Sequence, residues 1–318
     1  MIIQLLLLSV GFLILIKGAD WLVAGATSLA KKYGVSDLAI GLTIVAFGTS
    51  APELVVNIYA SASGHDGIAL GNAIGSNLFN LFFILGITGI IVTLKVQSST
   101  VKKEIPMSLI ATILLLLLAN NFFIGSVGEL SRFDGFILLA AFAYFLYYVY
   151  RMQRETPDVE EGKEKPVPVK MYRIILLIAA GLAGLVFGGN LILDNAVEIA
   201  HMIGISEKVI GLTIIAAGTS LPELATSIMA AIRKNTDIAV GNIVGSNIFN
   251  ILMILGLSAV IKPISYDILF NQDLILLLAG TSLLFFAMFT GKRKSLDRWE
   301  AAIMLIVYVA YVVWLIQS

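Results

Sequence analysis

The chain has 318 residues, of which 58% are hydrophobic and only 13% are charged, with no net charge and no cysteine. A soluble domain carries about 25% charged residues, so this composition is that of an integral membrane protein. The balanced charge gives no basic surface for nucleic acid, and the lack of cysteine excludes disulfides and thiolate metal sites. The first apolar run begins at Ile2 without a basic segment before it, which favours a retained membrane span over a signal peptide.

Ten segments are apolar and long enough to cross a bilayer, which takes roughly 20 residues. In chain order they cover residues 3–30, 37–61, 67–93, 104–122, 132–151, 172–202, 207–231, 237–261, 270–290 and 298–316. A charged, proline-containing stretch at 151–173 lies between the fifth and the sixth. We therefore expect an all-α membrane protein with a five-helix unit over 1–151, a cytoplasmic linker over 152–171 and a second five-helix unit over 172–318.

The distribution of basic residues predicts the orientation of the chain. If the N-terminus lies outside, most of the 21 Lys and Arg residues fall in inner loops or in the central linker. The outer loops then hold only Arg132, Lys208 and Lys262. Because cytoplasmic loops are rich in Lys and Arg, we expect both termini outside, in a multi-pass protein of the cell (inner) membrane.

The chain repeats itself at a constant offset of 170 residues, as from Glu53 to Glu223. Residues 35–91 align without a gap with residues 205–261, and the matched positions include Gly, Thr, Ser, Pro, Glu and Asn. Each half has five spans, an odd number, so the second half enters the membrane from the opposite side. We therefore predict two inverted repeats, a design in which transporters place the substrate site near the midplane between broken helices.

The most informative repeated stretch is AFGTSAPE at 46–53, which returns as AAGTSLPE at 216–223. Pro52 has no amide hydrogen and disfavours helical geometry at the residue before it, so the helix should kink or unwind within this stretch and its copy. Free carbonyls at membrane depth are tolerated where they line a cavity. With the Thr and Ser hydroxyls and the carboxylates of Glu53 and Glu223, they form a set of hard oxygens that suits Ca²⁺ or Na⁺.

A second repeated stretch, GNAIGSNLFN at 71–80 and GNIVGSNIFN at 241–250, falls in the third and eighth spans. Ser76 and Asn80 are four residues apart and share a helix face, and the copy keeps this spacing. Glycines four apart allow helices to approach closely. Taken singly, the glycines could form a packing seam, the hydroxyls could bond their own helix, and a glutamate could pair with Lys. A kink, a Glu and a Ser/Asn stripe that recur together predict an ion-binding site, because charge inside a membrane is expensive.

Four further charged residues lie within the spans: Lys17, Asp20, Asp194 and Glu198. Lys17 and Asp20 are three residues apart on the first span and are placed to pair with each other. The repeat counterparts of all four are uncharged. We therefore expect structural or access-path roles for them in place of ion ligation.

Two copies of Gly-Thr-Ser-x-Pro-Glu, each followed by Gly-Asn-x-x-Gly-Ser-Asn, resemble the alpha repeats of the cation/calcium exchanger superfamily, and in particular the prokaryotic sodium/calcium exchangers. The resemblance covers essentially the whole chain. It implies a ten-helix antiporter with long, tilted first and sixth helices and with ion sites between the second, third, seventh and eighth helices. Carried over position by position, it implies as ion-binding residues Glu53, Glu223, Thr49, Ser50, Thr219, Ser220, Ser76, Ser246, Asn80 and Asn250, with the carbonyls of Ala46 and Ala216.

Some members of the superfamily carry Asp where this chain has Asn80 or Asn250. Both positions are Asn here, which leaves two formal negative charges in the implied site, enough to match one Ca²⁺. This departure weakens the case for a potassium-dependent exchanger, which the resemblance associates with Asp.

We therefore expect a secondary active antiporter that exchanges Ca²⁺ for Na⁺ by alternating access, with the first and sixth helices sliding across a four-helix core. Its expected partners are Ca²⁺, Na⁺ and the lipid bilayer, with no cofactor, no nucleic acid, no protein partner and no enzymatic activity. One alternative is a proton/calcium antiporter in which the same two glutamates release Ca²⁺ when protonated. The others are a passive channel and an intramembrane hydrolase using Ser50 with Glu53, which lacks a neighbouring His or Lys base in the motif.

Overall fold

The computed structural model describes residues 2–120, 128–155, 170–202, 216–291 and 293–317. These residues are helical apart from short loops and four two-residue strands. Within them, seven helices are long and apolar enough to cross a membrane, or eight if the pair bent at Ser50 counts as one span. The prediction of an all-helical membrane protein is confirmed. The predicted linker at 152–171 falls largely on residues 156–169, outside the described part of the chain.

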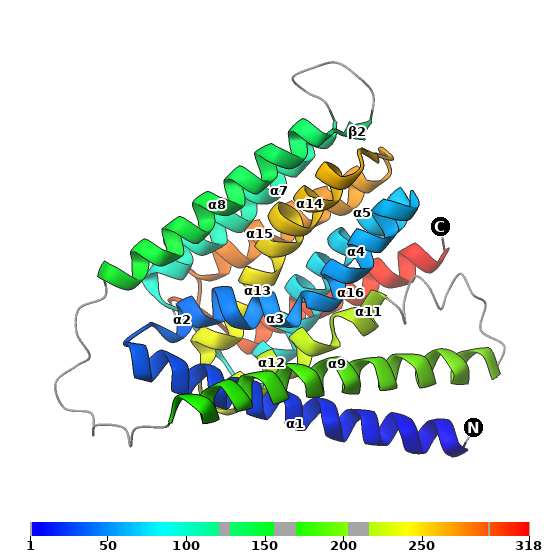
Figure 1. The fold of residues 1–318 in the computed structure, drawn as a ribbon. Helices are drawn as coiled ribbons and strands as arrows, with labels where there is room; N and C mark the ends of the chain where they lie inside the picture. Colours follow the sequence, from blue (N-terminus) through cyan, green and yellow to red (C-terminus); the bar gives the residue numbers. More distant parts are fainter. Residues whose placement is uncertain (1, 121–127, 156–169, 203–215, 292, 318) are drawn as a thin grey trace.

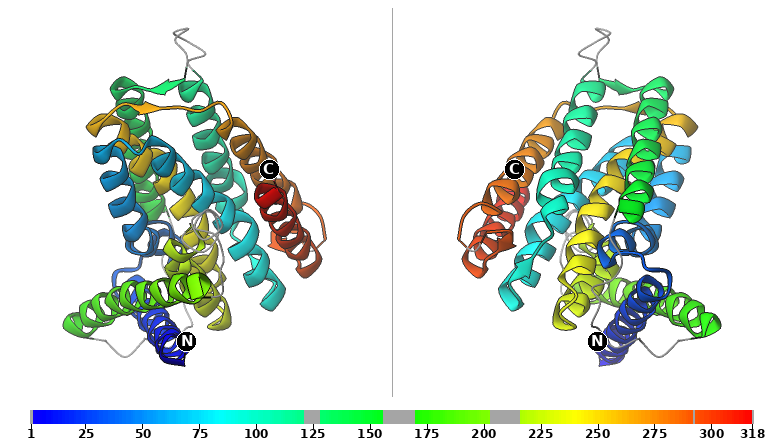
Figure 2. Two further views of the ribbon diagram at one scale, coloured as in Figure 1. Left: turned by 90° about the vertical axis from the view of Figure 1, so that its right-hand side faces the viewer. Right: turned by 90° about the vertical axis from the view of Figure 1, so that its left-hand side faces the viewer.

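Two long helices, α1 (Ile2–Tyr33) and α9 (Met171–Met202), lie against each other on one side of the other helices (Figures 1 and 2). Their contact is backbone to backbone. A methyl group at Gly18 would lie 2.7 Å from the backbone of α9, and one at Gly181 would lie 2.6 Å from the backbone of α1. Small residues permit such an approach between membrane helices. The predicted first and sixth spans therefore form one closely packed pair.

The second predicted span is broken in its middle. Its segments are α2 (Asp37–Ile40), the π-helical η1 (Gly41–Val45), α3 (Ala46–Thr49) and α4 (Ala51–Ser63). The chain bends by 49° at Ser50, between α3 and α4. Pro52 lies in the first turn of α4, where a missing amide hydrogen removes no helical hydrogen bond. The predicted kink is confirmed here.

The seventh span shows the same break. The helices α11 (Ala216–Thr219) and α12 (Leu221–Ile232) meet at Ser220, and Pro222 lies in the first turn of α12. The part of this span before residue 216 lies outside the described residues. Both Gly-Thr-Ser-x-Pro-Glu motifs thus end one helix and begin the next.

The third and eighth spans are long helices with a π-helical segment in the middle. The third consists of α5 (Asp66–Leu78), η2 (Phe79–Ile84) and α6 (Leu85–Ile91). The eighth consists of α13 (Thr236–Ile248), η5 (Phe249–Ile254) and α14 (Leu255–Ile261). π-helical turns inside α-helices frequently occur at functional sites. Asn80 and Asn250 each occupy the second position of such a segment.

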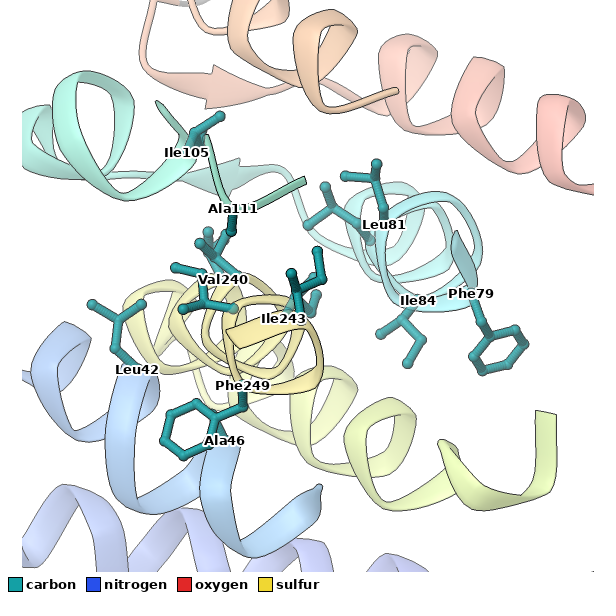
Figure 3. Packing of buried hydrophobic residues seen from close by; sticks show 14 of the residues in the cluster. Leu42, Ala46, Phe79, Leu81, Ile84, Ile105, Ala111, Val240, Ile243 and Phe249 are labelled. Atoms are coloured by element: carbon teal, nitrogen blue, oxygen red, sulfur yellow. The ribbon is translucent and has the colours of Figure 1, made fainter. Parts of the chain in front are cut away.

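The helix α13 lies at the centre of the buried core, where its side chains Val240 and Ile243 pack among those of neighbouring helices (Figure 3). Two glycines allow α13 to approach the broken second span. A methyl group at Gly245 would lie 2.8 Å from the Cβ of Ala46, and one at Gly241 would lie 3.0 Å from a backbone carbonyl of α2. The close approach predicted from glycine spacing is confirmed for this pair.

The remaining helices are η3 (Thr100–Glu104, π-helical), α7 (Ile105–Ala119), α8 (Arg132–Glu155), α15 (Phe270–Ala287) and α16 (Arg298–Gln317). The last helix of each half packs on the other half, α8 against α14 and α16 against α6. The antiparallel strand pairs do the same: β1 (Leu94–Lys95) pairs with β4 (Ser295–Leu296), and β2 (Glu129–Leu130) pairs with β3 (Ile264–Ser265). The two halves are therefore interlocked.

Candidate ion-binding site

The two repeated glutamates each lie in the first turn of a helix that starts at a break. Glu53 lies in α4 and Glu223 in α12, and each residue is only 1% exposed. The first turn of a helix has unpaired amide hydrogens and the positive end of the helix dipole, which stabilise a carboxylate. The proline-induced breaks therefore explain how two carboxylates are held inside an apolar protein.

The serine hydroxyls of the two motifs form hydrogen bonds between the halves of the chain. The Ser50 hydroxyl donates a hydrogen bond of 2.8 Å to Oε1 of Glu223, and the Ser220 hydroxyl donates one of 3.0 Å to Oε1 of Glu53. All four residues are buried. The structure thus brings the two motifs, predicted to form the halves of one site, into direct contact.

The two threonines of the motifs bond asparagines of the third and eighth spans. Thr49 donates to Oδ1 of Asn242 at 3.0 Å, and Thr219 donates to Oδ1 of Asn72 at 3.4 Å. Each asparagine bonds back to the broken span of its own half. Asn242 donates to the Ser227 hydroxyl at 3.0 Å, and Asn72 donates to Oδ1 of Asn57 at 2.6 Å.

Asn57 and Ser227 are site-supporting residues that we did not predict. They occupy matched positions of the repeat, and both are polar within an apolar helix. That coincidence is the signal in the sequence that could have identified them.

The predicted serines and asparagines of the second motif are also buried at this place. Ser246 donates to Oε1 of Glu223 at 3.4 Å. The side-chain amide of Asn80 donates to Oδ1 of Asn247 at 3.2 Å, and that of Asn250 donates to Oδ1 of Asn77 at 2.9 Å. Neither Asn77 nor Asn247 was among the predicted site residues.

Five buried oxygen atoms of these residues have no hydrogen-bond partner among the described residues. They are Oε2 of Glu53, Oε2 of Glu223, Oδ1 of Asn80, Oδ1 of Asn250 and the hydroxyl oxygen of Ser76. A buried polar atom without a partner costs about 1–3 kcal/mol. A dehydrated cation is one kind of partner for such atoms, since carboxylate, amide and hydroxyl oxygens are the ligands that Ca²⁺ takes in proteins.

This site differs from the usual protein metal centre. Among the described residues, no three His, Cys, Asp or Glu side chains come together in a way that could hold a metal ion. The polar atoms around the two glutamates are instead carboxylate, hydroxyl and amide oxygens, which are hard ligands.

The remaining predicted ligands are the backbone carbonyls of Ala46 and Ala216. The carbonyl oxygen of Ala46 accepts hydrogen bonds from the Ser50 amide at 2.9 Å and from the Thr49 hydroxyl at 3.3 Å. In this conformation it is therefore engaged within its own helix. Ala216 is the first residue of α11.

The other charged residues in the spans connect the long helices to their neighbours. Asp20 of α1 pairs with the guanidinium of Arg233 at the end of α12, with 2.9 Å between Oδ1 and Nε. Glu198 of α9 accepts a hydrogen bond of 2.9 Å from Gln4 of α1. The expected pairing of Asp20 with Lys17 is therefore wrong: the Asp20 carboxylate turns toward α12, and Lys17 is exposed.

Broken helices, two matched halves and a buried set of hard oxygens define a membrane transport protein for small cations. The chain belongs to the sodium/calcium exchanger protein family, whose model matches residues 3–151 and 173–317. The protein CaxA of Alkalimonas amylolytica is 38% identical over 326 residues, which cover 100% of both chains. The sodium/calcium exchanger MaX1 of Methanosarcina acetivorans is 31% identical over 350 residues, covering 98% of each chain.

A solved structure of the sodium–calcium exchanger NCX_Mj has a TM-score of 0.84 to this chain at 31% sequence identity, and the match covers 98% of both chains. The family resemblance inferred from the two repeated motifs is confirmed, as is a multi-pass membrane protein.

Proposed function

We propose that this protein exchanges Ca²⁺ for Na⁺ across the membrane at the site between α4, α5, α12 and α13. The observation that carries the proposal is the set of five buried, unpartnered oxygens on two glutamates, two asparagines and a serine. Two carboxylates balance one Ca²⁺, and neutral oxygens complete its coordination. Na⁺ is also bound by hard oxygens, so the two ions would compete for overlapping ligands.

The proposed ligands are the residues implied by the repeat. Glu53 and Glu223 supply the charge, and Asn80, Asn250 and Ser76 supply the unpartnered neutral oxygens. The proposed set is completed by Thr49, Ser50, Thr219, Ser220, Ser246 and the carbonyls of Ala46 and Ala216. Use of the Ala46 carbonyl requires that one of its two present hydrogen bonds be shared with the ion.

The proposed topology has ten transmembrane helices in two inverted five-helix repeats, over 1–151 and 172–318, with both termini outside. Two contacts support the proposed order of membrane crossings, because loops that pair must lie on the same side. The pair β1–β4 joins two loops that the distribution of Lys and Arg assigns to the inner side. The pair β2–β3 joins two loops assigned to the outer side. The choice of which side is outside rests on the distribution of Lys and Arg.

Exchange requires that the site open to one side at a time, and α1 with α9 is the proposed moving element. Leu182 and Leu193 of α9 pack over Gly48 and Gly218, the first residues of the two Gly-Thr-Ser motifs. A methyl group at either glycine would lie 2.5 Å from the leucine side chain. A shift of α9 along the core would therefore change the residues that cover each motif.

The test is Ca²⁺ uptake by proteoliposomes loaded with Na⁺ and diluted into Na⁺-free medium. We expect uptake that depends on the Na⁺ gradient and that is lost in the double variant Glu53→Gln, Glu223→Gln. Uptake that ignores the gradient, or that survives in this variant, would contradict the proposal. A pH gradient without Na⁺ forms the second arm, and uptake driven by it would identify a proton/calcium antiporter.

A further inference from the structure

Two buried asparagines outside the proposed ligand set form a crossed arrangement between the halves of the chain. Asn77 of α5 and Asn247 of α13 both lie one residue after a motif serine and three residues before a proposed ligand asparagine. We propose that Asn77 and Asn247 are positioning residues that orient the side-chain amides of Asn250 and Asn80, so that each presents its oxygen to the cation. This inference rests on the proposed function.

The orientation of Asn77 is fixed by a backbone group of the other half. Its side-chain nitrogen donates a hydrogen bond of 3.1 Å to the carbonyl oxygen of Asn247. The reciprocal bond, from the Asn247 side-chain nitrogen to the carbonyl oxygen of Asn77, is 3.5 Å long. A backbone carbonyl can only accept a hydrogen bond. Each of the two amides must therefore turn its nitrogen toward the opposite backbone and its oxygen away from it.

The fixed orientation of Asn77 and Asn247 in turn determines how the proposed ligands Asn250 and Asn80 are oriented. The Asn77 oxygen accepts a hydrogen bond of 2.9 Å from the Asn250 side-chain nitrogen, and the Asn247 oxygen accepts one of 3.2 Å from the Asn80 side-chain nitrogen. An oxygen can pair only with the nitrogen side of the facing amide. The other end of each ligand amide is then its oxygen, and these two oxygens are the ones without a partner among the described residues.

An amide that turns over keeps its shape and its charge but exchanges an acceptor for two donors. With its nitrogen toward the cation, Asn80 or Asn250 would repel the ion that it otherwise binds. Asn77 and Asn247 remove this alternative, and each does so for the ligand of the opposite half. The alternative role is purely structural, namely to hold α5 against α13.

Asparagine-to-aspartate variants separate the two roles, because a carboxylate presents an oxygen whichever way it turns. We would measure the KM for Ca²⁺ in Na⁺-loaded proteoliposomes, and the Ca²⁺-dependent rise in Tm in detergent as a measure of binding that needs no transport. Asn77→Ala should raise the KM about tenfold, the size expected for one misoriented polar contact. In an Asn250→Asp background a carboxylate oxygen would face the Asn77 oxygen, so the increase in KM should fall to within about twofold or reverse. In an Asn80→Asp background it should persist.

The reciprocal variant provides a matched control. Asn247→Ala should lose its effect in the Asn80→Asp background and keep it in the Asn250→Asp background. Should one alanine variant fail to fold, as judged by its Tm, the other tests the same relationship. A purely structural role predicts that each alanine substitution has the same effect in both aspartate backgrounds, and that result would overturn the proposal.

Failure of this inference can be distinguished from failure of the proposed function. If the unsubstituted protein shows no Na⁺-driven Ca²⁺ uptake, the proposed function is wrong. If it transports Ca²⁺ but the alanine effects do not depend on which asparagine is replaced by aspartate, the exchange function stands and the orienting role of Asn77 and Asn247 is wrong.

Discussion

Ser50 and Glu223, which come from opposite halves of the chain, are joined by a hydrogen bond of 2.8 Å from the serine hydroxyl to the carboxylate. The matched bond from Ser220 to Glu53 is 3.0 Å long. Each carboxylate is therefore held by the helix break of the other half. Neither half contains a complete site.

The first prediction concerns these two serines. A hydrogen bond to a charged group contributes about 1.5–3 kcal/mol. Ser50→Ala and Ser220→Ala should therefore each weaken Ca²⁺ binding by about tenfold or more, and to a similar extent, because the bonds are matched. Ca²⁺-dependent shifts in Tm measure the effect. Ser9→Ala, which removes a hydroxyl bonded to its own helix in α1, should leave binding unchanged. A strong effect of one motif serine and none of the other would contradict the matched site.

The second prediction concerns the ion pair between Asp20 of α1 and Arg233, the residue that follows α12. The pair joins the proposed moving helix to the core in the observed conformation, so its loss should shift the balance between conformations. Partly exposed pairs contribute about 0.2–1 kcal/mol. Asp20→Asn should thus change the exchange rate by no more than about fivefold. The affinity of the ion-binding site for Ca²⁺ should stay the same.

Charge reversal provides the control for this ion pair. Each single variant, Asp20→Arg or Arg233→Asp, should change the exchange rate. The double variant should bring the rate back toward that of the unsubstituted protein. If the double variant is as slow as the worse of the two single variants, the pair does not govern the rate.

The third prediction concerns the contact between α1 and α9. Gly18→Ala or Gly181→Ala would place a methyl group 2.7 Å or 2.6 Å from the backbone of the facing helix, and a backbone cannot turn aside as a side chain can. Each variant should lower the Tm and slow exchange. Gly189→Ala in α9 is the matched control, because outside its own stretch of helix the nearest atom to its methyl group would be a ring carbon of Pro222, 3.9 Å away. A loss of stability in the control as large as in the other variants would indicate a general helix effect.

The fourth prediction concerns ion selectivity. The carboxylates and unpartnered oxygens of the site are buried, so an ion must lose its water to bind. Mg²⁺ dehydrates reluctantly and demands a small octahedral shell, whereas Ca²⁺ accepts six to eight oxygens in flexible geometry. A tenfold excess of Mg²⁺ should therefore leave Ca²⁺ uptake nearly unchanged, while the larger Sr²⁺ should compete. Strong inhibition by Mg²⁺ would indicate a hydrated site.

Much of the site could be predicted because the sequence is duplicated. Glu53 and Glu223 identify each other by their constant offset, and the prolines beside them require a helix break. A charged side chain inside a membrane is energetically costly, so its presence indicates a functional site. The glycine pair Gly241 and Gly245 likewise predicted a close helix contact that the structure has.

The features that escaped prediction depend on packing between distant segments. The partner of Asp20 lies on another helix and has no counterpart in the repeat, so neither spacing nor symmetry points to Arg233. The roles of Asn77 and Asn247 follow from the way α5 and α13 face each other across the halves. The π-helical segments of the third and eighth spans were not predicted either.

The interlocking of the halves limits the kinds of motion open to this molecule. The strand pairs β1–β4 and β2–β3 join the two halves by backbone hydrogen bonds, and α8 and α16 each pack against a helix of the opposite half. In some transporters one half rotates as a rigid body against the other. Such a rotation here would break the hydrogen bonds of both strand pairs. These contacts therefore favour the proposed mechanism, in which the core stays in place as one body and the two-helix unit α1 with α9 moves along it.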